Sequence, residues 1–200
     1  ENAGVNVSRQ PLSPADPTPM VVTTPQISGP SGLRQGQTLT VQAGGELRAD
    51  YAVVGATLNI EGGSAGDFLE VVNGLIYLAE GSIGENLAVY SETYVNVVSG
   101  SVDRSFAIYS GGVVTVDGGN LGEGGVIHSG GELNVNGGQV GNDLVLKSGS
   151  QASVSGGLLG VYLRAVGGCI VHVIGGAIEG GASALPGSVV NLGAGSLGSN

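Results

Sequence analysis

Four side chains that could bind a ligand or exchange a proton recur at a fixed spacing. Tyr90, Tyr109, His128 and Lys147 follow one another at equal intervals along the sequence. In a chain that winds with this period, they would form one stripe along the molecule. Aromatic rings offer a large contact area with a polar tip, so the stripe could be a platform for a carbohydrate or a protein partner. It could equally be a stack that stabilises the chain's own fold.

A second stripe is polar and uncharged. It contains Asn59, Asn96, Thr115 and Asn134, whose spacing follows the same period with one shorter step. Such side chains can hydrogen-bond from one turn of a winding chain to the next. On an adhesive rod they could equally meet a second copy of the chain, so this stripe is the candidate for self-association.

Charged residues with the same spacing favour a structural role. Arg104 falls midway between Glu85 and Glu123. In successive turns of a winding chain, it would offset the repulsion between the two carboxylates.

Catalysis and metal binding find little support in the sequence. Glycosidases use two carboxylates about 5–9.5 Å apart, whereas Glu61 and Asp117 are three periods apart, about 14 Å at the spacing of paired strands. The two histidines, His128 and His172, belong to different stripes, so a shared metal site is not expected. Phosphate-loop, nucleophile-elbow and calcium-binding nonapeptide motifs are missing. We therefore expect no enzyme activity, no bound metal and no cofactor.

A strict internal repeat must position these stripes. Units of one constant length begin at Gly74 and follow one another to the end of the chain. The unit before them, from Ala56, is one residue shorter, and the unit from Gln37 again has the full length. Numbering each unit from its first residue, positions 3 and 5 are apolar in all nine units, and position 4 between them is mostly polar. This alternation is typical of a strand with one buried face. The first residues of the units are Gln37, Ala56, Gly74, Thr93, Gly112, Gly131, Ser150, Cys169 and Ser188.

Further apolar positions predict two more short strands in each unit. Position 10 and the pair at positions 14 and 16 are mostly apolar, and in the first unit Tyr51 and Val53 fit this pattern better than Asp50 and Ala52. We therefore expect a one-residue slip there. Position 8 is always glycine, which indicates a corner that needs a positive φ or a close backbone approach.

The repeat predicts an all-β fold, a single-stranded parallel β-helix of about eight to nine coils with 19 residues per coil. Successive coils would lie about 4.8 Å apart. A sandwich or barrel would not explain one period held through nine units. Collagen needs glycine at every third residue, and this pattern is missing.

Composition restricts the function classes further. Of 200 residues, 40 are glycine and 41% are hydrophobic, which argues against disorder. A net charge of −10 with only six basic residues would repel phosphate backbones, so no nucleic-acid partner is expected. The single cysteine allows no internal disulfide. There is no basic-then-apolar leader and no run of 18 apolar residues, so we expect a soluble or mature portion of its protein.

The two ends of the chain differ from the repeat. Six of the seven prolines precede Ser31, and proline cannot donate to a strand ladder, so residues 1–36 are expected to be an extended leader or a cap without regular coils. Residues 37–200 form the repeat domain. The last unit begins at Ser188 and is partial, so we expect the rod to continue in a longer parent protein. An open end would also invite end-to-end association.

The stretch SGGVVTVDGGNLGEGGVIHSGGELNVNGGQVGNDLVLKSG, residues 110–149, resembles the glycine-rich repeats, similar in length, of AIDA-type self-associating autotransporter adhesins. The resemblance covers residues 37–200 and lies in the period and the glycine corners; no individual functional residue is matched. It implies a right-handed β-helix on the surface of a Gram-negative bacterium. The implied function is adhesion, autoaggregation or biofilm formation.

Two other classes stay open. One is a phage tailspike or a β-helix that binds or degrades polysaccharide, for which the stripe from Tyr90 to Lys147 is the best candidate face. The other is a structural stalk without a ligand site. The expected partners are a second copy, side by side or end to end, or a glycan or protein of a cell surface.

Overall fold

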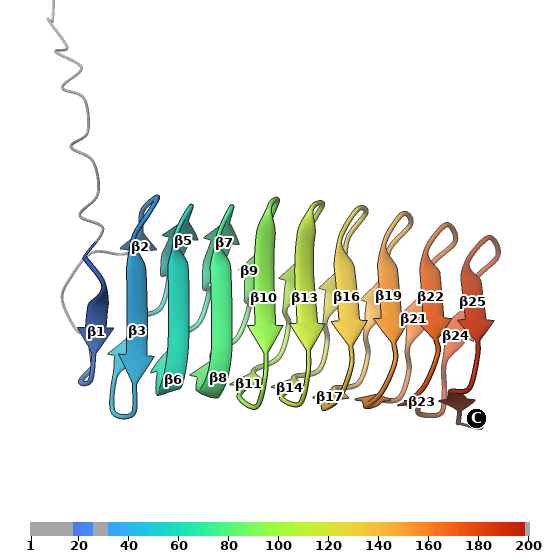
Figure 1. Cartoon of the computed structure of the whole chain (residues 1–200). Helices are drawn as coiled ribbons and strands as arrows, with labels where there is room; N and C mark the ends of the chain where they lie inside the picture. The colour runs from blue at the N-terminus through green and yellow to red at the C-terminus, as the bar shows by residue number, and fades with distance from the viewer. Residues whose placement is uncertain (1–17, 26–31, 199–200) are drawn as a thin grey trace, which may run out of the picture.

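The computed structural model describes residues 18–25 and 32–198, and within these ranges all regular secondary structure is β. The chain forms a parallel β-helix of about nine coils, which confirms the predicted fold (Figure 1). The strands facing the viewer run downward while the coils advance from left to right, so the winding is right-handed. The described part of the chain contains no helix that is long and apolar enough to cross a membrane.

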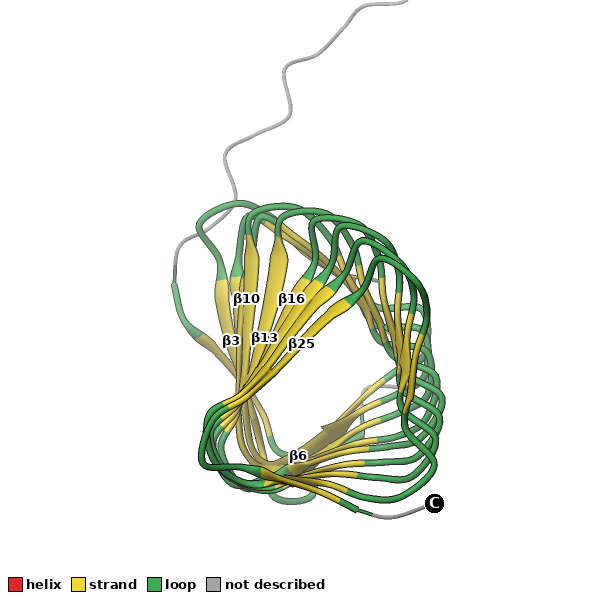
Figure 2. Ribbon diagram, turned by 90° about the vertical axis from the view of Figure 1, so that its right-hand side faces the viewer, coloured by secondary structure: helices red, strands yellow, loops and turns green. Residues whose placement is uncertain are grey.

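Each coil contributes three strands, and these build three faces around the core (Figure 2). We call the faces the front, lower and rear sheets. The front sheet contains β1 (Met20–Val22), β3 (Thr38–Gln42), β6 (Thr57–Ala65), β8 (Leu75–Ile83), β10 (Thr93–Val97), β13 (Gly112–Val116), β16 (Glu132–Val135), β19 (Gln151–Val154), β22 (Ile170–Val173) and β25 (Val189–Leu192).

The lower sheet continues the front sheet around a bend, because β6 and β8 run through both. Its other strands are β4 (Glu46–Leu47), β11 (Ser101–Val102), β14 (Asn120–Leu121), β17 (Gln139–Val140), β20 (Leu158–Leu159), β23 (Ala177–Ile178) and β26 (Ser196–Leu197). The rear sheet contains β2 (Gly32–Leu33), β5 (Ala52–Val54), β7 (Glu70–Val72), β9 (Ala88–Val89), β12 (Ala107–Ile108), β15 (Val126–Ile127), β18 (Val145–Leu146), β21 (Arg164–Ala165) and β24 (Ser183–Ala184).

The strand register reproduces the sequence period. Val114 pairs with Leu133 in the front sheet, and Ile127 pairs with Leu146 in the rear sheet. From the unit beginning at Gln37 to the one beginning at Cys169, positions 3 and 5 are buried, as predicted from their apolar character. The predicted slip in the first coil is also confirmed, because Tyr51 and Val53 are buried.

The corner glycines at position 8 serve both predicted purposes. Gly138 has a φ of 67°, which only glycine adopts readily. Gly100 is not among the residues with a positive φ. A Cβ there would lie 2.6 Å from Leu78 and 2.8 Å from the carbonyl oxygen of Gly81.

At a further corner, the residue at position 13 has a left-handed backbone conformation in successive coils. The sequence pattern does not predict this corner. Its φ values range from 59° to 76°, although four of these residues are neither glycine nor asparagine. The N–H groups at this corner point toward the next coil: Ser105 N–H donates to the Glu123 carbonyl at 2.8 Å. Strand residues donate in the opposite direction, as Val126 N–H does to the Phe106 carbonyl at 2.9 Å. The corner is occupied by Phe68, Asn86, Ser105, Gly124, Asp143, Tyr162 and Gly181.

Two short strands precede the first unit despite the nearby prolines. β1 pairs with β3, and β2 pairs with β5. Val22 and Leu33 are buried against the core. These two strands lie against the first coil, and the prolines fall outside both of them. The predicted leader or cap otherwise falls largely on residues 1–17 and 26–31, outside the described residues.

Candidate functional site

Three of the four residues in the predicted aromatic stripe lie in direct contact. They follow β9, β12 and β15 on the rear sheet. The rings of Tyr90 and Tyr109 have centroids 4.7 Å apart with an angle of 7° between their planes. The rings of Tyr109 and His128 have centroids 4.5 Å apart at 14°. Lys147 continues the stripe by one coil and is exposed, without a ring contact in the described part of the chain.

The stacking decides which surfaces of these rings a ligand could reach. Tyr90 covers one face of the Tyr109 ring and His128 covers the other, so a sugar could not stack on Tyr109. Burial, with a smaller contribution from the Glu70 carboxylate, raises the pKa of Tyr90 and keeps its phenol protonated. The geometry favours the stabilising role over the binding role. Binding through ring edges and polar tips stays a prediction.

The polar stripe runs along the front sheet with its side chains outward and half-buried. Its residues are aligned by strand register: Asn96 pairs with Thr115, and Thr115 with Asn134. Asn59 joins the line through Tyr77, which pairs with both Asn59 and Asn96.

Hydrogen bonds within this stripe differ from the predicted ladder. Asn134 donates to the Glu132 carboxylate of its own strand at 2.7 Å. The Oδ1 atom of Asn96 is buried without a hydrogen-bond partner, and among the described residues no other side-chain N or O atom is in this state. At the far end of the stripe, His172 and Asn191 are in contact at 3.2 Å.

Hydrogen bonds from coil to coil occur instead in the neighbouring stripe at position 6. Asn136 donates to the Asp117 carboxylate at 2.9 Å, and its own amide oxygen accepts from the Ser155 hydroxyl at 2.9 Å. The predicted type of ladder therefore exists, mainly two positions further along the strands.

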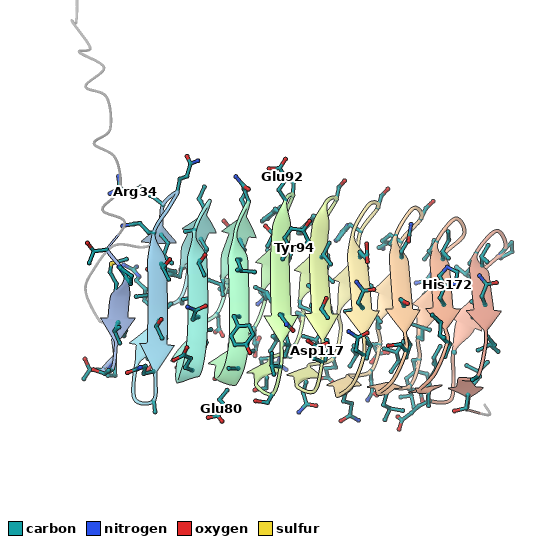
Figure 3. The ribbon with its side chains drawn as sticks, in the orientation of Figure 1. Arg34, Glu80, Glu92, Tyr94, Asp117 and His172 are labelled. Atoms are coloured by element: carbon teal, nitrogen blue, oxygen red, sulfur yellow. The ribbon has the colours of Figure 1, made fainter. Side chains whose placement is uncertain are left out.

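An exposed aromatic cluster on the front sheet escaped the sequence analysis. Tyr94 is 61% exposed, Leu75 is 44% exposed and Tyr77 is 40% exposed. Figure 3 shows Tyr94 standing on the front of β10. With Asn96 these residues form what we call the front patch. Positions 2 and 4, taken together across adjacent coils, reveal the cluster in the sequence, whereas position 4 alone is mostly polar and does not.

The outward positions 2 and 4 of the front sheet carry little charge for so acidic a protein. Position 4 contains no Asp, Glu, Lys or Arg in any of the nine units, and position 2 contains only Glu132. At position 6 the acidic residues are Glu61 and Asp117. Most carboxylates lie at the corners and on the other faces.

The corner between the lower and rear sheets holds the charged stripe around Arg104. Its Nη2 atom lies 2.7 Å from Oε1 of Glu85, and this contact raises the pKa of Arg104. Within the described residues Glu123 forms no ion pair, but its charge also raises the pKa of Arg104, so Arg104 offsets Glu85 by direct contact and Glu123 at longer range. The Asp67 carboxylate accepts the backbone N–H of Glu85 at 2.9 Å. These contacts agree with the structural interpretation.

The structure also places Glu80 opposite Glu61, which the alignment of units had missed because β6 and β8 pair irregularly there. Both carboxylates are exposed to solvent, and Figure 3 shows Glu80 pointing away at the lower end of β8. Cys169 is buried, and burial raises the pKa of its thiol. Among the described residues no cluster of three His, Cys, Asp or Glu side chains could hold a metal ion.

Fold and surface together define a parallel β-solenoid repeat protein whose front sheet has one charged residue, Glu132, at its outward positions 2 and 4. Comparison of the chain with protein-family models, curated proteins and solved structures found no match.

Proposed function

We propose that the chain is a non-enzymatic β-helical adhesin module, displayed on a bacterial surface or secreted, that acts in adhesion, autoaggregation or biofilm formation. The observation that supports this most is the front sheet, which offers half-buried polar side chains and exposed aromatic rings along successive coils, with Glu132 as the one Asp, Glu, Lys or Arg at its outward positions 2 and 4.

Electrostatics favour this face for contact between copies. Two molecules that each carry a net charge of −10 repel one another at long range. Along the outward positions 2 and 4 of the front sheet only Glu132 is charged, so copies can approach there at a lower cost than through the corners, where most carboxylates lie. Asn59 and Thr115 form no side-chain hydrogen bonds within the described residues, so their polar groups are available to a partner.

Bacteria that display the chain provide the test. A double variant, Asn59→Glu with Thr115→Glu, places two carboxylates on the front sheet, and we expect autoaggregation to be lost because facing copies would bring like charges together. The matched control, Asn120→Glu with Gln139→Glu, adds the same charge to exposed positions of the lower sheet and should aggregate as the parent does.

Two results would count against the proposal. Equal loss of aggregation in both double variants would mean that total charge matters and the front sheet does not. Degradation of a polysaccharide by the purified chain would show that it is an enzyme and contradict the proposed adhesin function.

A further inference from the structure

The front patch is a rectangle of four outward side chains on two adjacent strands. Leu75 and Tyr77 lie on β8, and Tyr94 and Asn96 lie on β10, with Leu75 opposite Tyr94 and Tyr77 opposite Asn96. Paired strands are about 4.8 Å apart, and alternate residues along a strand about 6.7 Å apart. A rectangle of this size matches one sugar ring, with the two tyrosines at diagonal corners.

The two tyrosine rings are available for stacking, unlike those on the rear sheet. Tyr94 and Tyr77 are 61% and 40% exposed. Among the described residues, neither ring stacks on another ring. A pyranose presents an apolar face of C–H groups, and covering an aromatic ring with such a face removes apolar area from water on both sides.

The side chain of Asn96 supplies a hydrogen-bond acceptor that has no donor partner. Its Oδ1 atom is buried and unpaired, a state that is unfavourable for a polar group. Asn96 pairs with Tyr77 on one side and with Thr115 on the other. Exposed side chains change rotamer quickly, and binding requires that such a change open Oδ1 to the ligand. A ligand with an O–H or N–H group beside its apolar face would satisfy Oδ1.

Charge around the patch selects among ligands of this shape. The patch itself carries no ionisable group other than the two phenols. Figure 3 shows Glu92 above it and Glu80 and Asp117 toward its lower side. On a molecule of net charge −10 these carboxylates disfavour sulfated or phosphorylated glycans.

We infer that the front patch binds a neutral glycan, an uncharged hexose or N-acetylhexosamine ring that stacks on Tyr94 and Tyr77 and donates a hydrogen bond to Oδ1 of Asn96. The inference deepens the proposed function by naming the chemical class of ligand on the adhesive face, and it rests on that proposal for its biological role.

The test uses the purified 200-residue chain and three probes. The N-acetylglucosamine tetrasaccharide is neutral, its deacetylated counterpart has the same backbone with positive charge, and a heparin tetrasaccharide is negative. Binding is measured by titration calorimetry and by tyrosine fluorescence, which no tryptophan obscures because the chain has none. We expect the neutral probe to bind and heparin not to bind.

Variants locate the site. Tyr94→Ala should weaken binding of the neutral probe about tenfold or more, as for an aromatic anchor, and Tyr94→Phe should retain it. Tyr162→Ala is the matched control, because Tyr162 is 62% exposed at a corner remote from the front sheet and should leave binding unchanged. An unchanged urea midpoint for Tyr94→Ala shows that the variant is folded.

Three outcomes would overturn the inference: no binding of the neutral probe, equal binding by the parent and Tyr94→Ala, or preference for the charged probes that disappears with salt. Failure of the proposed function looks different. Sugar binding with no effect of front-sheet charges on aggregation contradicts self-association through this face, whereas front-sheet-dependent aggregation without sugar binding contradicts only the present inference.

Discussion

At the scale of single residues, the sizes of the core side chains in adjacent coils complement one another. At position 14, Gly125 lies between coils that carry Phe106 and Leu144 at the same position, and all three are buried. A Cβ on Gly125 would overlap the ring of Phe106. The space that a side chain at position 125 would occupy is therefore filled by the ring of Phe106 from the preceding coil.

We expect Gly125→Ala to destabilise the protein by about 1–3 kcal/mol, the usual cost of overpacking a core. Its φ is not positive, so the backbone conformation itself accepts alanine. Combining it with Phe106→Leu should recover most of the loss, because leucine occupies this position in other coils. Urea unfolding of the two single variants and the double variant measures the coupling, and simple additivity would refute the fit.

Two buried groups that lose a proton at alkaline pH, the thiol of Cys169 and the phenol of Tyr51, make the stability of the fold depend on pH in that range. Burial raises the pKa of Cys169 above its ordinary 9.0 and that of Tyr51 above 10.0. The folded chain therefore holds these protons at pH values where the unfolded chain has released them, and stability falls as the pH rises through this window. Cys169→Ala should reduce the fall in urea midpoint from pH 9, and Tyr51→Phe only from pH 10. Unchanged slopes in both variants would show that other groups govern the alkaline limit.

At the scale of elements, the corners are as regular as the strands. The left-handed residue at position 13 turns its N–H toward the following coil, so the ladder of backbone hydrogen bonds continues where the strands end. Non-glycine residues in this conformation cost about 1–2 kcal/mol. Several coils therefore contain a corner that is strained by its side chain.

Ser105→Gly should stabilise the protein by up to about 1 kcal/mol, because the relief of strain at a φ of 65° exceeds the added freedom of the unfolded chain. Ser129→Gly is the control, since Ser129 is exposed and is not among the residues with a positive φ. It should destabilise by about 0.5–1 kcal/mol. Thermal or urea unfolding gives both values, and the same sign for both would contradict the argument.

Sequence predicted the strands better than the corners or the candidate site. The inward positions of the strands require apolar side chains, so the alternation of apolar and polar residues is enough to predict that Val114 and Val116 are buried in a strand. Position 13 shows no such restriction: Phe68, Ser105 and Tyr162 share a backbone conformation but no chemistry. The Tyr90–Tyr109 stack followed from exact spacing, whereas the unpaired Oδ1 atom of Asn96 depends on side-chain directions that the spacing does not specify.

At the scale of the whole molecule, charge is distributed unequally among the faces. Most carboxylates lie at the corners, for example Asp67, Glu85 and Glu123, whereas the outward positions 2 and 4 of the front sheet carry only Glu132. Long-range repulsion between copies is therefore screened by salt, while short-range contact through the front sheet is not.

Self-association should strengthen as salt rises from about 0.01 M to 0.1 M, where the screening length falls from about 30 Å to about 10 Å. Sedimentation velocity of the purified chain at the two concentrations measures this. Weaker association at the higher concentration would mean that ion pairs hold the copies together.

Because Val114 pairs with Leu133, and Leu133 with Ala152, at a constant offset, a coil behaves as an interchangeable unit of length. Removing residues 131–149 would join Gly130 to Ser150, bring Val114 opposite Ala152 and shorten the rod by about 4.8 Å, while every stripe would stay continuous. The gain or loss of whole repeats in the gene therefore changes the length of the rod and keeps the outward positions of the remaining coils aligned.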